Sequence, residues 1–155
     1  MTFRLSGLDP APFQHLFGLS DDALARVAAR RYAVDVSPGF PDRVELRDLR
    51  VGEVALLVNH MHQPAATAYR ASHAILVREG ATEAVSFTGA IPEVIRSRPI
   101  SLRAFDGGGE MVDADLVDGA ELAPVIGRML AHGEVAYLHA HYARRGCYAA
   151  LIERG

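Results

Sequence analysis

The chain has 155 residues; half are apolar and about a quarter are charged, which is the composition of one globular domain. Its formal net charge is -3 and basic residues never exceed two in a row, so the sequence predicts no binding to nucleic acid. All 16 basic residues are Arg. Because Schiff-base chemistry needs a lysine amine, we exclude pyridoxal phosphate as a cofactor.

The redox compartment follows from the single cysteine, Cys147, which leaves no internal disulfide and suits a reducing environment. The first residues hold no apolar core of signal-peptide length. Apolar runs such as residues 54–58 are far too short to cross a bilayer. We therefore expect one cytoplasmic domain over residues 1–155 that does not associate with membranes, and we leave a homodimer open.

Apolar and β-branched runs bounded by turn residues predict the strands of the N-terminal half. They cover residues 3–6, 31–36, 53–60, 74–77 and 84–88. Ser20 precedes Asp21 and Asp22, which predicts a helix N-terminus because Ser caps the first turn and the helix dipole favours anions there. We expect this helix to end near Arg31. Pro92 predicts the start of a second, short helix.

The C-terminal half reads as two hairpins separated by a helix. Residues 99–106 and 110–117 flank three glycines and predict the first hairpin. A pivot at Gly108 places Arg103 opposite Asp113 and Phe105 opposite Met111. In that register Asp113 faces outward with Asp115, whereas three side chains face the core: Val112, Ala114 and Leu116. The glycine loop precedes a strand, so we reject a phosphate cradle, which needs a helix N-terminus.

A capping box at Asp118 and Glu121 predicts a helix that ends near Gly133, although Pro124 delays its regular part. Residues 134–142 and 147–153 then predict the last hairpin, with His141 opposite Tyr148. Because neighbouring strands are joined by short turns, we predict an α+β fold. It consists of one mainly antiparallel or mixed sheet with two or three helices packed on it.

The chain has seven histidines, and two pairs of them have metal-ligand spacing. His139 and His141 lie on a predicted strand and therefore share one face. His60 and His62 repeat the spacing at the end of another strand. Imidazoles bind zinc, copper and iron, so these four residues predict a divalent transition-metal site. The simpler interpretation is a half-buried face on which each histidine hydrogen-bonds to its neighbours.

Arginines beside tyrosines predict a site for a small anion, because guanidinium donors hold carboxylates and phosphates. Tyr69 and Arg70 occupy one loop, and Arg144 occupies the last turn. The predicted ligand-binding residues are His62, Arg70, Ser72, His73, His139, His141, Arg144 and Tyr148.

Two further constellations have alternative interpretations. Asp113 and Asp115 would bind a hard cation or act as acid and base, but the preferred interpretation is a cross-strand ion pair on a solvated face. Cys147 would be a nucleophile if His141 lowered its pKa. The predicted hairpin places these two side chains on opposite faces, so Cys147 is interpreted as a small core residue.

Four stretches resemble a bacterial family of domains of unknown function, number 1203. They are residues 62–64, 69–79, 101–106 and 135–148. The resemblance implies a bacterial, cytoplasmic, stand-alone domain and implies no activity. Many members carry Cys where this chain has Asp42, so a thiol role at that position does not transfer.

Three functional classes stay open. The first is a binding module or small enzyme with a pocket for a small anionic molecule. The second is a metalloprotein that uses the two histidine pairs, with Asp113 or Asp115 as a further ligand. The third is an interaction domain whose histidines lie on a polar sheet face. We further predict that His62 or His73 shares one concave surface with His141 and Arg144.

Overall fold

Nine strands carry the fold of residues 2–155, which the computed structural model describes, and they form two antiparallel sheets. The large sheet has the order β5-β1-β9-β8-β6-β7 and the small sheet the order β2-β3-β4. The strands are β1 (Phe3–Ser6), β2 (Arg30–Ala33), β3 (Val54–Gln63), β4 (Ala71–Arg78), β5 (Ser86–Thr88), β6 (Pro99–Phe105), β7 (Met111–Asp118), β8 (Tyr137–Tyr142) and β9 (Tyr148–Arg154). The α+β class is confirmed, but the expected single sheet is divided in two.

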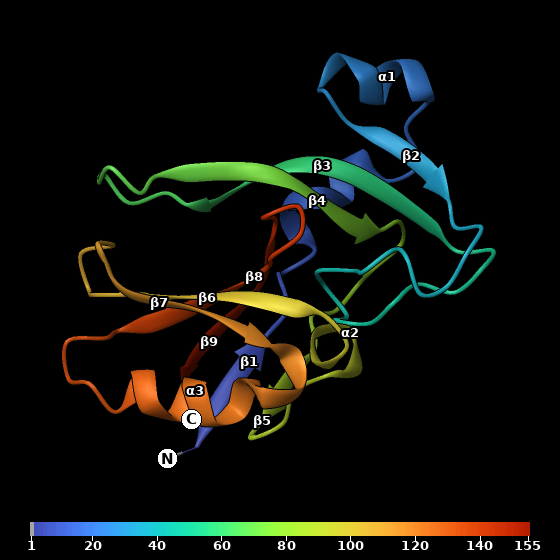
Figure 1. The fold of residues 1–155 in the computed structure, drawn as a ribbon. Coiled ribbons are helices and arrows are strands. Elements are labelled where there is room, and N and C mark those ends of the chain that lie inside the picture. Colours follow the sequence, from blue (N-terminus) through green and yellow to red (C-terminus); the bar gives the residue numbers. More distant parts are fainter. Residues whose placement is uncertain (1) are drawn as a thin grey trace.

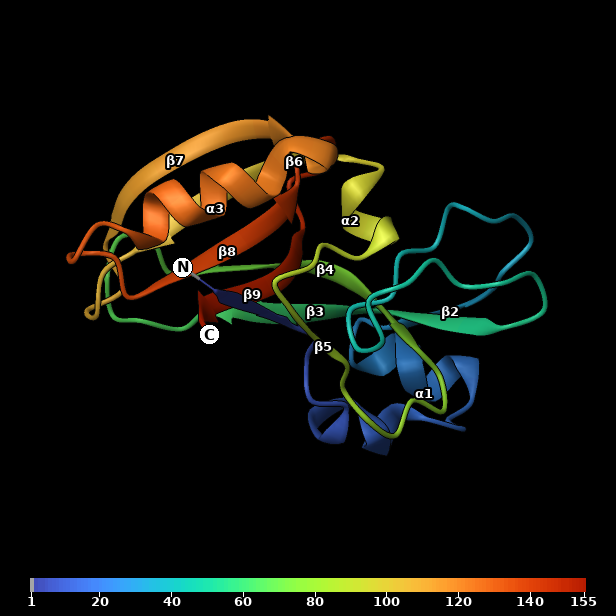
Figure 2. The same cartoon turned by 90° about the horizontal axis from the view of Figure 1, so that it is seen from below.

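The helices are short and lie at the outside of the sheets. They are the 3-10 helices η1 (Ala11–Leu16) and η2 (Gly119–Glu121) and the α-helices α1 (Asp21–Arg26), α2 (Glu93–Arg96) and α3 (Leu122–Leu130). The small sheet lies over one side of the large sheet and α3 lies on the other (Figure 1). Seen from below, α3 runs alongside β6 and β8 (Figure 2). None of these helices is long and apolar enough to cross a membrane.

The main core fills the space between α3 and the large sheet. Leu102 and Ala104 of β6 are fully buried there, and Ile126 and Met129 of α3 cover them. Each fully buried aliphatic side chain contributes about 1.5–3 kcal/mol, which offsets the entropy of ordering this short helix. Since side chains alternate along a strand, the residues between these core positions lie on the opposite face. That second face holds the polar side chains of β6 and β8 and is covered by β3 and β4.

The hairpin of β6 and β7 corrects one predicted register. Phe105 does pair with Met111, but Ala104 pairs with Asp113 and Arg103 pairs with Ala114, because a bulge at Val112 shifts the strands by one residue. A one-residue shift moves every later side chain to the other face. Leu116 is consequently 71% exposed, so the predicted core role of Ala114 and Leu116 is wrong.

Two predicted helices differ from the structure near their ends. Ser20 caps α1 as expected, because its Oγ accepts the N–H of Ala23 at 3.1 Å, but the helix ends at Arg26. Asp118 makes no side-chain cap, and the regular turns of α3 begin only at Leu122. Pro124 explains that late start, because it has no N–H to donate to an earlier carbonyl.

Candidate functional site

Three histidines from both sheets meet between them, and we call His62, His139 and His141 the imidazole cluster. The ring centroid of His62 on β3 lies 4.8 Å from that of His141 and 6.2 Å from that of His139, both on β8. The rings of His139 and His141 are 6.2 Å apart. Tyr148 of β9 packs against all three at 5.2–5.8 Å. Both histidine pairs thus contribute to one place in the fold.

Strand alternation places the cluster. His139 and His141 are two residues apart on β8 and point away from the α3 side, where Leu138 and Ala140 are fully buried. His141 pairs with Tyr148 across the last hairpin, as the sequence predicts. A register irregularity lies between His60 and Gln63 on β3. His60 and His62 therefore have different surroundings.

Burial controls the protonation of the cluster. His141 is completely buried and His139 is 5% exposed. Desolvation lowers the pKa of His139 and of His141 to about 3 and that of His62 to about 4, and the neighbouring histidines and Arg103 act in the same direction. All three rings are therefore neutral near pH 7.

Several ring nitrogens of the cluster have no hydrogen-bond partner among the described residues 2–155. Nδ1 of His141 lies 2.9 Å from the carbonyl oxygen of Gly146, to which it donates in the neutral ring. Its Nε2 is then a lone pair, and this atom is buried without a partner among residues 2–155. Nδ1 of His62 and Nδ1 of His139 are also buried without a hydrogen-bond partner among the described residues. Buried polar atoms usually have hydrogen-bond partners, and these three exceptions lie together in one cluster.

Arg103 is the cationic residue of the site. It is the cross-strand partner of His139 on β6, and its half-buried guanidinium donates from Nε to the hydroxyl of Ser101 at 3.2 Å. Burial lowers the pKa of Arg103, and no carboxylate within the described chain counters that effect. The sequence predicts that Arg103 pairs with Asp113. In the structure, Asp113 and Asp115 both form ion pairs with Arg128 of α3 instead.

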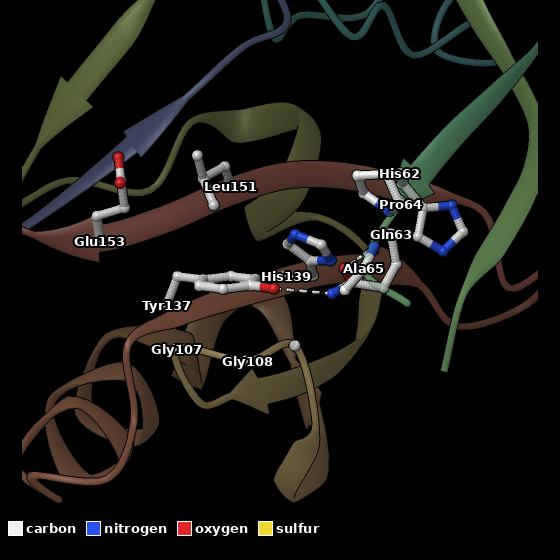
Figure 3. Close-up of a pocket in the computed structure, with 11 residues that line it drawn as sticks. His62, Gln63, Pro64, Ala65, Gly107, Gly108, Tyr137, His139, Leu151 and Glu153 are labelled. Atoms are coloured by element: carbon white, nitrogen blue, oxygen red, sulfur yellow. Dashed lines mark hydrogen bonds between the residues drawn. The ribbon is translucent and has the colours of Figure 1, made fainter. Parts of the chain in front are cut away.

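A cavity of about 480 Å³ opens beside the cluster, between the end of β3 and strands β8 and β9 (Figure 3). Nε2 of Gln63 donates to the hydroxyl of Tyr137 at 2.9 Å and closes one side. Gly109 lies so close to Ala65 that a Cβ on it would overlap that side chain. The lining residues are His62, Gln63, Pro64, Ala65, Gly107, Gly108, Gly109, Tyr137, His139, Leu151 and Glu153.

Other predicted site residues lie outside this arrangement. Arg70 is exposed and donates to the carbonyl oxygen of Pro64 at 2.8 Å. Ser72 and Arg144 are exposed as well. Nδ1 of His73 lies 3.0 Å from the carbonyl oxygen of Ala74. The structure therefore brings together His62, His139, His141 and Tyr148 of the predicted ligand-binding set, and their binding role stays a prediction.

His60 completes the predicted metal set but faces a different environment. Its ring lies 6.0 Å from Phe13 and 5.7 Å from Tyr148, and it lines a second cavity of about 460 Å³ beside η1. Burial lowers its pKa. In the part of the chain that the structure describes, no group of three or more His, Cys, Asp or Glu side chains is placed to hold a metal ion.

Cys147 and Asp42 have structural surroundings. Cys147 lies in the core on the α3 side, where Nη2 of the buried Arg43 approaches its Sγ to 3.0 Å. Asp42 is fully buried, and its carboxylate accepts backbone N–H groups of Val44, Glu45 and Arg78. Such an arrangement holds a turn in place.

The comparison with protein families decides the identity of the chain. A family model described as a protein of unknown function, DUF1203, matches residues 39–154. The chain belongs to this family. The matched residues include the whole imidazole cluster, Arg103 and the lining of the cavity. A comparison with curated proteins finds no match, and neither does a comparison with solved structures.

Sequence reasoning missed most of the cavity wall. Gln63 and Glu153 receive no role from the sequence, and Arg103, which the sequence pairs with Asp113, is not among the residues that line the cavity. Alternation along the predicted strand places Tyr137 on the same face as His139 and His141, but it does not predict a cavity. Gln63 and Glu153 reach the cavity only through the packing of β3 against β9, which no local pattern encodes.

Proposed function

We propose that this protein binds a small anionic molecule between Arg103 and the imidazole cluster. The observation that carries the proposal is a half-buried guanidinium that has no carboxylate partner within residues 2–155 and stands beside buried neutral imidazoles. A charge withdrawn from water without a counter-ion is costly, and a bound anion would remove that cost. Guanidinium donors match carboxylate and phosphate groups.

The local charge favours an anion over a metal ion. Arg103 is the cross-strand partner of His139, and its positive charge adds to the desolvation that lowers the pKa of all three rings of the cluster. The same positive field opposes a divalent cation and attracts a negative group. Glu153 at the far side of the cavity is paired with Arg4 at 3.4 Å, so its charge is partly compensated.

The imidazoles complete the site. Each neutral ring offers one N–H donor and one lone pair, so the cluster can donate to a bound anion without itself being charged. The aromatic side chains around it, including Phe105 at 5.0 Å from His139, keep water away from these contacts. A hydrogen bond to a charged group is stronger in such surroundings than in water.

Thermal unfolding with anions of different shape tests the proposal. The purified protein is heated with acetate, citrate or inorganic phosphate, each compared with chloride at equal ionic strength. An anion present at 100 times its Kd stabilises the protein by about 2.7 kcal/mol, which raises the Tm by roughly 5–10 °C for a chain of this size.

Two variants make the test specific. Arg103→Met keeps the apolar stem of the side chain and should abolish the rise in Tm. Arg145→Met removes an exposed arginine from the last turn and should leave the rise unchanged. Equal stabilisation of the wild-type protein and Arg103→Met would contradict the proposed site, as would the lack of any effect of all three anions.

A further inference from the structure

Arg103 presents one edge of its guanidinium to the face that carries the imidazole cluster. Ser101 pairs with His141 and Arg103 pairs with His139, so the two β6 side chains share that face. Nε of Arg103 donates to the Ser101 hydroxyl at 3.2 Å, whereas Nη1 and Nη2 donate to no side chain or carbonyl among residues 2–155. Neither Nη atom is among the buried atoms without a partner, so this edge of the guanidinium reaches solvent. An anion can therefore approach it from outside.

The site carries one uncompensated positive charge. The three rings of the cluster are neutral near pH 7, because withdrawal from water disfavours their charged form. Within the described chain no carboxylate acts on the pKa of Arg103 or on that of His139. Glu153, across the neighbouring cavity, is paired with Arg4. The charge of Arg103 is thus the charge that a ligand has to balance.

We infer that this site selects anions with a single negative charge, such as a monocarboxylate or a sulfonate, over dianions of the same shape. The inference rests on the proposed function and names the ligand class of the same site. One negative charge completes a neutral pair with Arg103. A second negative charge would leave water without a cation to meet it, and that desolvation is costly. The two free Nη groups form a fork that matches two oxygens of one carboxylate or sulfonate group.

Matched pairs of ligands that differ by one charge test this inference. Methanesulfonate and sulfate share a tetrahedral shape, and malonamate and malonate share a carbon skeleton. At pH 7.5 the second member of each pair carries one more negative charge. Titrations are followed by NMR through the histidine ring signals, with the chloride concentration the same in both arms so that its competition cancels. We expect the singly charged member of each pair to have a Kd about fivefold lower or better.

Two substitutions by lysine at serine positions test the charge balance directly. Ser101→Lys adds a second positive charge beside Arg103 on the same face of β6, so it should shift the preference towards the dianion of each pair. Ser97→Lys makes the same change at an exposed position after α2 and should keep the wild-type preference. Arg103→Met should lose the binding of all four ligands.

The outcomes separate the two proposals. A dianion that binds the wild-type protein as tightly as its singly charged partner, in either pair, would overturn the single-charge inference and leave anion binding intact. Failure of all four ligands, together with no stabilisation by acetate, citrate or phosphate, would overturn the proposed function itself. An unchanged preference in folded Ser101→Lys would refute the charge-balance reasoning. The wild-type comparison needs no variant, so a folding defect in Ser101→Lys does not remove the test.

Discussion

Acidification should destabilise the protein through its buried histidines. His139 and His141 titrate near pH 6.5 when unfolded, whereas burial lowers the folded pKa of each to about 3. The unfolded state therefore binds more protons than the folded state at any pH between these values. By linkage, stability is complete above about pH 6.5 and is lost as the pH falls through the window below it.

The size of the loss follows from the pKa difference. Between pH 7 and pH 5, a group that is protonated only when unfolded lowers the free energy of unfolding by about 2 kcal/mol. His141, which is fully buried, and His139, which is almost fully buried, together lower the free energy of unfolding by about 4 kcal/mol over this range. His62 adds to this loss. Such a loss is a large part of the 5–15 kcal/mol that typically stabilises a domain.

Urea unfolding at pH 7, 6 and 5, followed by circular dichroism, measures the effect. His139→Phe removes one of the responsible groups, so the loss between pH 7 and pH 5 should shrink by about 2 kcal/mol relative to the wild-type protein. His132→Asn, at an exposed position, should keep the full loss. The carboxylates of the protein also titrate in this pH range, but they contribute equally to the wild-type protein and to each variant. Their effect therefore cancels when the pH-dependent losses of two proteins are compared. A wild-type stability that is flat from pH 7 to pH 5, or an unchanged loss in His139→Phe, would refute the reasoning.

Two predictions concern other parts of the structure. Gly119→Ala should cost about 3 kcal/mol in urea unfolding, because a Cβ there would overlap the carbonyl oxygen of Ile95, whereas Gly133→Ala, which meets nothing within 4 Å, should change stability little. Glu53→Gln should cost about 1–2 kcal/mol at pH 7, because Glu53 makes two bonds of 2.7 Å to Arg47. That pair lowers the pKa of Glu53 to about 2, so its contribution is present above pH 4.5 and the cost of Glu53→Gln should vanish as the pH falls towards 2. Equal stability of Glu53→Gln and wild-type protein at pH 7 would contradict this account.

Local patterns in the chain predicted much of the fold. Alternating apolar residues gave the strand positions, and Ser20 marked a helix start that the structure confirms. The pairing of His141 with Tyr148 followed from a short hairpin, whose register depends on a few neighbouring residues. The resemblance to the family was also readable, and the family model confirms it.

Long-range packing decided what local patterns could not. The strands divide into two sheets because β3 pairs with β2 and β4 and with no strand of the large sheet. The residues in the turns do not indicate which strands pair. A bulge at Val112 reversed the faces of β7, since a single extra residue shifts every side chain after it. It also explains why Asp113 contacts Arg128 and leaves Arg103 without that partner.

The candidate site shows the same division. Alternation along a strand is enough to predict that His139 and His141 share a face. The packing of the two sheets is needed to place His62 over that face, and the strand register is needed to place Arg103 beside it without a carboxylate partner among residues 2–155. Burial between two sheets is a property of the assembled layers, and it is burial that keeps these imidazoles neutral near pH 7.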